Sequence, residues 1–304
     1  MTVEVNTGWQ VRLESLALIR VSGEDSKSFL QGQLSNDVER LDGQRRAQLS
    51  SFSNARGRVY AVLLVLYFGI DDYGLVLPRA QADDVAQRLT LFVLRSKVSV
   101  TPAKDALLTG IAGDSLPASL ADKPWATTDL GDDALAVRWP DDGTARALAV
   151  YGSAPAAEVC ESSDDTRWWR HEVSAGVPWI LAPQAREQHV AQMLDLDLLE
   201  GISFDKGCYT GQEVIARTHY LGRVKRRLHR LGAEQPIADA LGAPIEACSE
   251  DGAWQKTGSV VLSAGKEVLA VLQLDHARRP LRLAPQTSAP ALDLTVLPLL
   301  RKSI

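Results

Sequence analysis

The 304-residue chain has few cysteines, and their spacing excludes several kinds of sulfur site. The three are far apart in the sequence: Cys160, Cys208 and Cys248. A framework of disulfides and a Cys-x-x-Cys metal or redox motif are therefore both excluded. The four thiolates that usually hold an iron–sulfur cluster are also missing. A single cysteine with a chemical role is still compatible with this count.

Long apolar runs and an excess of positive charge are missing as well. The longest apolar run, residues 59–70, is shorter than the ~20 residues that a membrane-spanning helix needs. Residues 1–13 have no basic segment followed by an apolar one, so we expect no secretory signal, no membrane association and a cytoplasmic protein. The chain has 33 basic and 38 acidic residues, and its net charge of −5 excludes a surface that binds nucleic acid all over.

What the sequence does contain is an alternation of strand and helix patterns over the first hundred residues. The order is β-α-β-β-α-β with an extra strand, which is typical of a compact α+β unit. The expected strands are residues 15–21, 48–54, 59–70, 75–77 and 96–100, and the expected helices are residues 24–34 and 79–95. Asp25 or Ser26 would cap the first of these helices.

A second, weaker unit and an all-β end follow. Strand patterns at residues 106–112, 134–139 and 145–151 precede a predicted helix at residues 187–199. After Tyr220, short strand patterns alternate with turns, which is typical of a small, partly closed barrel. The strands of this barrel are expected at residues 224–231, 258–262, 268–274 and 281–283.

Residues able to do chemistry are concentrated in one segment, GISFDKGCYTGQEVIAR. Its Thr210 and Glu213 fit a capping box, which predicts a helix over residues 211–221. Cys208 would lie just outside the N-terminus of this helix, where the helix dipole and the charge of Lys206 both favour thiolate over thiol. The alternative is a small buried cysteine in a glycine-rich turn, and the residues alone favour it.

Two further patterns indicate ordinary structural roles. Glu213 and Arg217 are four residues apart, which is typical of a solvent-exposed helix pair that contributes about 0.3–0.5 kcal/mol. The histidines, among them His171, His189 and His276, have no metal-ligand spacing. We therefore expect no metal site.

The segment KGCYTGQE, which ends at Glu213, together with Arg217, resembles the signature of the YgfZ-type folate-binding proteins. These are relatives of the glycine-cleavage T-protein (aminomethyltransferase) and are implicated in the maturation of iron–sulfur proteins. Three further segments support the resemblance: FLQGQLSND from Phe29, NARG from Asn54 and QMLDLDLL from Gln192. The similarity extends from residue 15 to residue 300, and it implies that Cys208 is a functional residue.

The resemblance implies an α+β, T-protein-like fold, with two ferredoxin-like α+β parts around a central folate site and a C-terminal β-barrel. Residues 1–220 would form the folate-binding region, with parts at 1–103 and 104–220, and residues 221–304 would form the barrel. The implied ligand is tetrahydrofolate, including its polyglutamylated form, whose pterin needs an apolar slot and whose tail needs positive charge. The implied partners are iron–sulfur client or assembly proteins, and we expect a monomer.

The resemblance also implies roles for individual residues. Cys208 would be the essential thiol and Lys206 its activator. The implied contacts with the folate or with the loop come from six residues: Trp168, Glu172, Tyr209, Gln212, Glu213 and Arg217. Trp168 stands where the family has a tryptophan associated with folate. Leu16 stands where the family can have a second tryptophan, so one stacking partner is either missing or supplied by Trp9.

Two departures from the T-protein pattern affect the expected activity. Ala61 and Val62 stand in place of an acidic pair, and neither side chain can carry a proton. Ser174 replaces a glutamate that contacts the pterin, whereas Glu172 lies two residues away and would share its face on an extended segment. Aminomethyl transfer is therefore not expected.

A basic stretch follows the signature. Residues 217–230 hold six Arg or Lys and no acid, whereas residues 187–205 hold five acids and no Lys or Arg. The basic stretch is either a solvated sheet face or an anchor for a polyglutamylated folate tail or for RNA.

The sequence leads to three hypotheses for the function. The first is a folate-binding accessory factor for assembly or repair of iron–sulfur proteins, indirectly supporting cluster-dependent tRNA modification. The second is a folate-dependent aminomethyl or methylene transferase, and the third is an RNA-binding module. The last would use Arg223, Lys225, Arg226 and Arg227.

Overall fold

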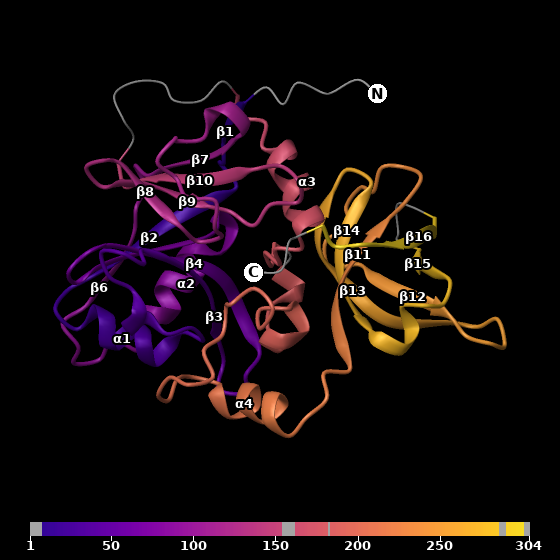
Figure 1. Ribbon diagram of the computed structural model, residues 1–304. Helices are drawn as coiled ribbons and strands as arrows, with labels where there is room; N and C mark the ends of the chain where they lie inside the picture. Colours follow the sequence, from indigo (N-terminus) through magenta and orange to yellow (C-terminus); the bar gives the residue numbers. More distant parts are fainter. Residues whose placement is uncertain (1–7, 154–161, 182, 286–289, 301–304) are drawn as a thin grey trace.

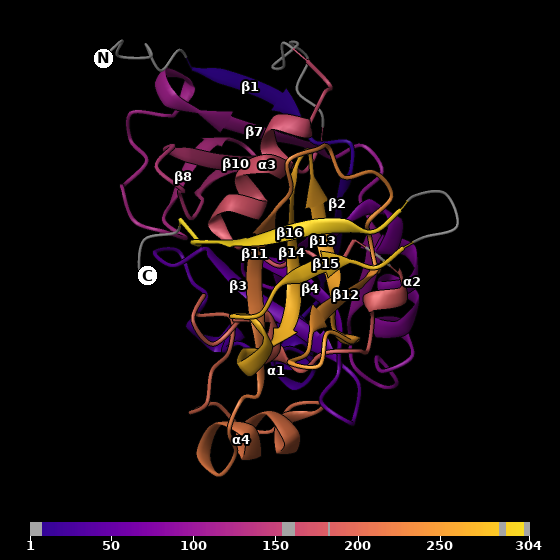
Figure 2. The same cartoon turned by 90° about the vertical axis from the view of Figure 1, so that its right-hand side faces the viewer.

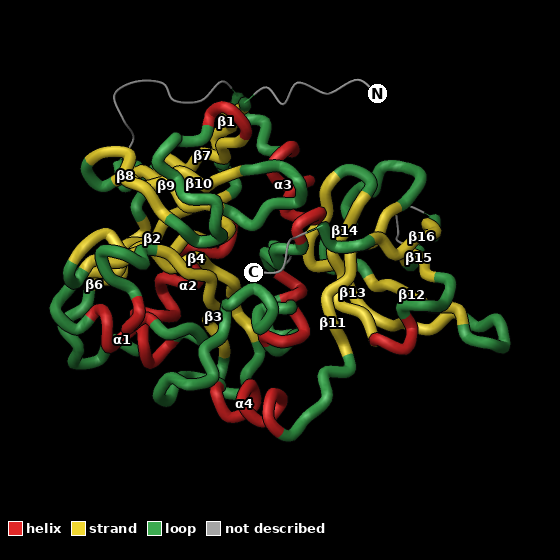
Figure 3. The backbone as a smooth tube through the Cα atoms, viewed as in Figure 1, coloured by secondary structure: helices red, strands yellow, loops and turns green. Residues whose placement is uncertain are grey.

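The computed structural model describes residues 8–153, 162–181, 183–285 and 290–300 (Figure 1). Its strands form two five-stranded sheets and a closed six-stranded barrel. The two sheets lie on one side of the molecule and the barrel lies on the other (Figure 1). Strands predominate over helices in the two sheets and the barrel, whereas the described residues between 152 and 225 form only helices and loops (Figure 3).

The first sheet has the order β3-β4-β5-β2-β6, and all its neighbouring strands are antiparallel. Its strands are β2 (Leu16–Ser22), β3 (Ala47–Ser53), β4 (Val59–Gly69), β5 (Asp72–Pro78) and β6 (Ser99–Pro102). Two helices, α1 (Ser26–Gln33) and α2 (Arg79–Thr90), contribute Leu30, Val85 and Leu89 to a core with one face of this sheet. Because strand side chains alternate between faces, Leu63 of β4 joins this core while Leu64 points to the opposite side.

The second sheet has the order β1-β7-β10-β9-β8. Its strands are β1 (Trp9–Arg12), β7 (Leu107–Ala112), β8 (Thr127–Gly131), β9 (Ala134–Arg138) and β10 (Arg146–Tyr151). Leu148 of β10 and Val137 of β9 meet the free face of the first sheet in a large shared core. The helix α3 (Thr166–Ala175) adds Trp168 to this core and packs against the barrel.

The barrel closes in the order β11-β14-β13-β12-β15-β16. Its strands are β11 (Arg226–Gly232), β12 (Pro244–Cys248), β13 (Trp254–Ala264), β14 (Glu267–Gln273), β15 (Leu281–Leu283) and β16 (Leu292–Leu297). The helix α4 (Gln212–Tyr220) precedes it, at the lower end of the molecule in Figures 1 and 2. Short 3-10 helices complete the described chain: η1 (Val38–Arg40), η2 (Gly113–Ser115), η3 (Pro183–Ala185), η4 (Ala191–Leu194) and η5 (Leu274–His276).

The predicted α+β class with a C-terminal β-barrel is confirmed, and several details differ. The barrel is fully closed, because β12 and β16 supply two strands that the sequence patterns did not indicate. The strands β1 and β8 were not predicted either. Although β1 comes first in the chain, it belongs to the second sheet, where it pairs with β7. None of the helices in the described part of the chain is both long and apolar enough to cross a bilayer.

The helix predicted at residues 187–199 is wrong. Only the short η4 forms there, and the chain turns on either side of it because Glu187 (φ 57°) and Asp195 (φ 56°) adopt left-handed backbone conformations. The apolar residues at helical spacing, such as Leu194 and Leu199, are buried by this irregular path instead. Tertiary packing therefore decides the local structure here.

Candidate functional site

The loop that carries Cys208 is bound to the end of α1 by a buried lysine. The Lys206 ammonium donates hydrogen bonds to three carbonyl oxygens, those of Gln31 (2.7 Å), Leu34 (2.8 Å) and Asn36 (2.9 Å). These carbonyls belong to the last turn of α1 and the residues after it, which lack partners within the helix. Lys206 therefore caps the C-terminus of α1 from a distant part of the sequence.

Further hydrogen bonds join the same two segments. The amide of Thr210 donates to the carbonyl of Gly32 (3.1 Å), and the amide of Ser203 donates to the carbonyl of Ser35 (3.0 Å). The Asn36 side-chain amide donates to the carbonyl of Glu200 (2.6 Å). The segments FLQGQLSND and KGCYTGQE, which are far apart in the sequence, therefore form one hydrogen-bonded unit.

A pair of glycines brings the third segment, NARG, against the start of α4. Gly211 (φ 84°) and Gly57 (φ 67°) both adopt left-handed conformations. A Cβ atom at Gly211 would lie 2.6 Å from the carbonyl oxygen of Asn54, and one at Gly57 would lie 2.8 Å from the Cβ of Val214. Both positions therefore need glycine for their backbone conformation and for the close approach.

The fourth segment supports α4 from behind. Gln192 is buried, and its side-chain amide donates to the carbonyl of Ile215 in α4 (2.7 Å). Ile215 is itself fully buried in the shared core. All four segments that carry the family resemblance thus converge on the Cys208 loop.

Cys208 is exposed, and its neighbours in the loop are fixed. Tyr209 is buried with its ring centroid 4.9 Å from the Lys206 ammonium, and burial raises the pKa of the Tyr209 hydroxyl. Burial lowers the pKa of Lys206 to about 8, against the opposing effect of Asp37 and Glu39, so the ammonium is still charged at neutral pH. Cys248 is half-buried, and Cys160 lies outside the described residues.

Lys206 is directed at the carbonyl oxygens of α1, and within the described residues its ammonium makes no hydrogen bond to the Cys208 thiol. The helix dipole is also farther from Cys208 than expected, because α4 begins at Gln212. The capping-box prediction is wrong. Gly211 occupies the cap position without a side-chain hydrogen bond, and the Thr210 hydroxyl contacts the Gln33 side chain (3.4 Å) instead. The activation of Cys208 by Lys206 stays a prediction.

The other predicted residues of α4 either contact the loop or face the solvent. The Gln212 side-chain amide makes a long contact with the carbonyl of Lys206 (3.5 Å) and so closes the loop on itself. Glu213 and Arg217 are exposed, and no ion pair joins them in the described structure. Both are available to a ligand or partner.

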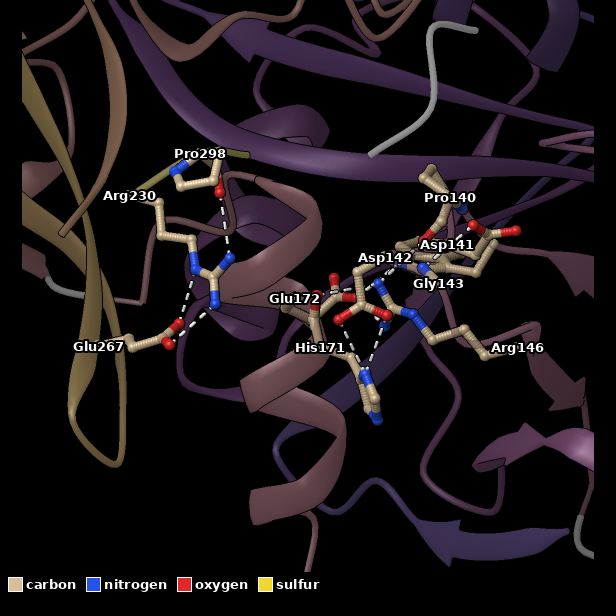
Figure 4. A network of polar contacts seen from close by, with 11 residues as sticks. Pro140, Asp141, Asp142, Gly143, Arg146, His171, Glu172, Arg230, Glu267 and Pro298 are labelled. Carbon is tan, nitrogen blue, oxygen red and sulfur yellow. Dashed lines mark hydrogen bonds and ion pairs between the residues drawn. The ribbon is translucent and has the colours of Figure 1, made fainter. Parts of the chain in front are cut away.

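Glu172 lies in α3, where it is completely buried (Figure 4). One carboxylate oxygen accepts hydrogen bonds from Trp139 Nε1 (2.7 Å) and from Arg146, and the other accepts from Trp179 Nε1. Burial raises the pKa of Glu172, and the Arg146 guanidinium opposes this shift. The expected extended segment is wrong: the segment is helical, so Glu172 and Ser174 do not share a face.

Trp168 is also fully buried. Its ring packs against Gly110 and Trp139, with the Arg146 guanidinium 4.8 Å from the ring centroid. Trp9 lies near the same helix, with its ring stacked on His171 (5.8 Å). In this conformation a pterin cannot contact Trp168 or Glu172 directly, because both side chains are enclosed by protein.

The predicted ligand residues thus form two separate groups. Trp168 and Glu172 belong to α3, whereas the signature residues belong to the loop before α4 and to α4 itself. The helix α4 lies at the lower end of the molecule in both Figures 1 and 2, whereas α3 lies in the upper half, beside the second sheet. The structure does not bring the eight predicted residues together at one point.

A cavity of about 480 Å³ opens beside the signature loop. Its lining combines aromatic and charged residues: Phe52, Phe92, Arg56, Arg88, Glu187 and Thr210. Neither Arg88 nor Phe92 was expected at the site, because the helical spacing of Phe92 indicated a core-facing position and Arg88 carries no motif. Phe92 is in fact 42% exposed, just beyond the end of α2. This cavity offers an aromatic surface and two guanidinium groups next to the signature loop.

The basic stretch is partly neutralised. Arg227 makes a two-pronged ion pair with Asp197 (2.6 and 2.8 Å) and a contact with Asp195 (3.2 Å). Arg230 pairs with both carboxylate oxygens of Glu267 (2.7 and 2.8 Å), as Figure 4 shows. Arg223, Lys225 and Arg226 stay exposed. In the described part of the chain, no three His, Cys, Asp or Glu side chains are grouped to hold a metal ion.

Comparison with known proteins identifies the family. No protein-family model matches the chain. The tRNA-modifying protein YgfZ of Cronobacter sakazakii is 30% identical over 280 residues, which cover 88% of this chain and 82% of that protein. The tRNA-modifying protein YgfZ of Sodalis glossinidius is 30% identical over 95% of this chain and 92% of its own length.

The fold has a known counterpart as well. The crystal structure of glycine cleavage system aminomethyltransferase T from Bartonella henselae matches 97% of this chain and 86% of its own, with a TM-score of 0.69 and 14% identity. This likeness establishes a T-protein-like fold. Together with the two relatives, which match it along most of its length, it leads to one conclusion: the chain belongs to the YgfZ family.

Proposed function

We propose that the protein binds a reduced folate, tetrahydrofolate or its polyglutamylated form, and supports the assembly or repair of iron–sulfur proteins on which tRNA modification depends. Its partners would be client or assembly proteins, and it would act in the cytoplasm as a monomer. Residues 1–220 would form the folate-binding region and residues 221–304 the barrel domain. The names of the relatives and the T-protein-like fold support this proposal.

The observation that carries the proposal is an exposed thiol on an anchored loop. Cys208 is exposed, while Lys206 and Tyr209 on either side of it are buried. Three distant segments of the chain stabilise this loop and the start of α4 through buried hydrogen bonds and a glycine contact. Such a framework fixes the position of a reactive group, and a cysteine with only a packing role would instead be buried.

Cys208 would act as the essential thiol toward a partner or a one-carbon species. Glu213 and Arg217 would contact that partner or the folate tail from the exposed side of α4, and Tyr209 and Gln212 would hold the loop. Trp168 and Glu172 would support the folate region from within, since both are enclosed in the present conformation. A bound folate would supply a carrier for one-carbon units.

A complementation experiment tests the role of the thiol. In a strain that lacks the gene, wild-type protein and Cys248→Ser should restore the activity of cluster-dependent enzymes, whereas Cys208→Ser should not. Cys248 is the matched control, because it is a second free cysteine in a different part of the fold. Full restoration by Cys208→Ser, at equal protein level, would show that the thiol is dispensable.

Calorimetry tests the ligand separately. We expect saturable binding of tetrahydrofolate to the purified chain, and a polyglutamylated form should bind more tightly because its tail can reach free positive charge. Arg88→Gln should weaken binding if the cavity beside the signature loop holds part of the folate, and Lys104→Gln, an exposed charge in another region, should not. An absence of folate binding would contradict the proposed ligand but not the proposed role of Cys208, which the complementation experiment tests separately.

Methylene or aminomethyl transfer is a second candidate, because the fold is that of an aminomethyltransferase. Ala61 and Val62 are both buried in β4 and supply no carboxylate. Turnover of tetrahydrofolate with a methylamine donor would establish this activity. Failure over a broad set of donors would exclude it.

RNA binding is a third candidate, favoured by an aromatic cluster on the exposed side of α4. Phe204 stacks on His219 with ring centroids 3.7 Å apart, and Tyr220 beside them is 63% exposed. Exposed aromatic rings beside free arginines and lysines are typical of single-strand binding. Binding of a tRNA fragment that weakens steeply with salt would support this candidate, and no shift at moderate salt would exclude it.

A further inference from the structure

A small polar cavity lies between the barrel and the segment before η4, and it shares no residue with the signature loop or its cavity. Its volume is about 190 Å³. At about 30 Å³ for each water molecule, it has room for a tetrahedral oxyanion and a few waters. The side chains that define it come from separate elements: His189 from the loop before η4, Arg226 from β11, and Lys256, Thr257 and Ser259 from β13.

His189 is the unusual member of this cavity. It is only 6% exposed, and neither of its ring nitrogens has a hydrogen-bond partner among the described residues. Its backbone is fixed, because its carbonyl accepts a hydrogen bond from Val59 (2.8 Å) and the next residue, Val190, pairs with Arg58 in a β-bridge. A buried polar group without a partner costs about 1–3 kcal/mol. A ligand in the cavity that hydrogen-bonds to the imidazole would remove this cost.

The charge of the cavity indicates what that partner is. Arg226 and Lys256 are exposed and have no ion-pair partner among the described residues, whereas Arg227 and Arg230 on the same strand are both paired with carboxylates. None of the described residues that line the cavity is acidic. Burial, together with the charges of Arg58 and Arg226, lowers the pKa of His189 to about 4, so its neutral ring has one N–H to donate.

We propose that this cavity binds a phosphate-type oxyanion, with charge from Arg226 and Lys256 and hydrogen bonds from the His189 ring and the Ser259 hydroxyl. Guanidinium and ammonium groups make strong charge-assisted hydrogen bonds to phosphate oxygens, and a neutral imidazole N–H adds direction to them. Inorganic phosphate, a nucleotide and an RNA chain all present phosphate oxygens of this kind, so each is a candidate source of the oxyanion. The site is independent of Cys208 and of folate.

The test titrates inorganic phosphate into the full chain at constant ionic strength, followed by calorimetry and by the ring resonances of His189. We expect saturable binding at one site and a shift of the His189 signals. A nucleoside 5′-monophosphate and a short RNA without terminal phosphates then identify the source, since the true source should bind more tightly than phosphate alone. The proposal is overturned if phosphate binding does not saturate, if the His189 signals do not move, or if triglutamate binds more tightly than every phosphate compound.

Matched variants separate a defined site from a diffuse field of charge. Arg226→Gln and Lys256→Gln should each weaken phosphate binding by about tenfold, which corresponds to about 1.4 kcal/mol. Arg95→Gln and Lys104→Gln remove the same charges outside the cavity and should leave the affinity unchanged. Equal weakening by Arg95→Gln would overturn the proposal. His189→Gln should also weaken binding, and the thermal midpoint of each variant shows whether it is folded.

Discussion

At the scale of single residues, Lys206 shows how a side chain in a reactive-looking motif can have a structural role. Its ammonium is buried and donates to three carbonyl oxygens at the end of α1. A family signature that contains a lysine beside a cysteine indicates activation of the thiol, yet the geometry also gives the lysine the task of holding the loop. The two roles make different predictions for stability.

We expect Lys206→Met to destabilise the protein by roughly 2–4 kcal/mol, because three carbonyl oxygens lose a charged donor while the side-chain volume is nearly kept. Urea unfolding of the purified chains measures this difference. Lys225→Met is the matched control, since Lys225 is exposed, and it should change stability by less than about 0.5 kcal/mol. Equal stability of the two variants would contradict the capping role of Lys206.

His189 gives a prediction for pH. Its folded pKa of about 4 lies below the ordinary value of 6.5, because of burial and the charges of Arg58 and Arg226, and Lys256 also lines its cavity. Between these two values the unfolded chain binds a proton that the folded chain does not, so the stability that His189 contributes is present above pH 6.5 and is lost as the pH falls toward 4. The loss approaches about 3 kcal/mol.

The measurement compares unfolding free energies of wild type and His189→Gln in phosphate-free buffer at about pH 7.5 and about pH 4.5. Every other group titrates in both proteins, so the difference between them isolates His189. Wild type should lose more stability than the variant on acidification. An identical pH dependence would mean that the folded imidazole titrates normally.

At the scale of elements, the contact between the NARG turn and the start of α4 rests on glycine. Gly211→Ala should destabilise the chain by about 2 kcal/mol or more, because it puts a Cβ in a left-handed conformation and against the carbonyl of Asn54. Gly207→Ala in the same loop is the control, since nothing lies within 4 Å of its added Cβ. Unfolding midpoints of the two variants decide the question, and equal midpoints would count against a tight contact here.

The elements also show how far sequence patterns reach. The long apolar run of β4 and the helix α1 are predicted nearly to their ends, because each buries a continuous apolar face, whereas α2 ends at Thr90 rather than at the expected Arg95. The strands β8 and β16 were missed, since both are short and few of their residues are fully buried. Such short strands are specified by the neighbours they pair with, which no local pattern records.

The same limit applies to the site. The signature predicted a loop followed by a helix, and α4 forms within one residue of its expected end. The anchoring of that loop by the end of α1, and the closing of Trp168 and Glu172 inside the fold, depend on contacts between distant segments. Spacing in the sequence cannot specify such contacts.

At the scale of the whole molecule, one core joins parts that the sequence separates. The shared core contains Leu64 of the first sheet, Leu148 of the second, Tyr209 of the signature loop and Leu269 of the barrel. The barrel also has its own interior core, with Val260 and Leu272 among its members. Because the outer face of the barrel is buried by the sheets and α3, we expect the barrel and the sheets to unfold together.

Native-state hydrogen exchange tests this cooperativity. Amides of β4 and of β14 should exchange with the same highest free energy, since both open only when the shared core is lost. Leu269→Ala, on the outer side of the barrel, should lower that free energy in both strands equally, by about 2–4 kcal/mol, because the cavity it leaves lies in the common core. Val260→Ala, which leaves a cavity in the interior core of the barrel, should likewise lower this free energy equally in both strands. If Leu269→Ala lowered protection in β14 alone, the barrel would be an independent folding unit, and the signature loop would not owe its stability to it.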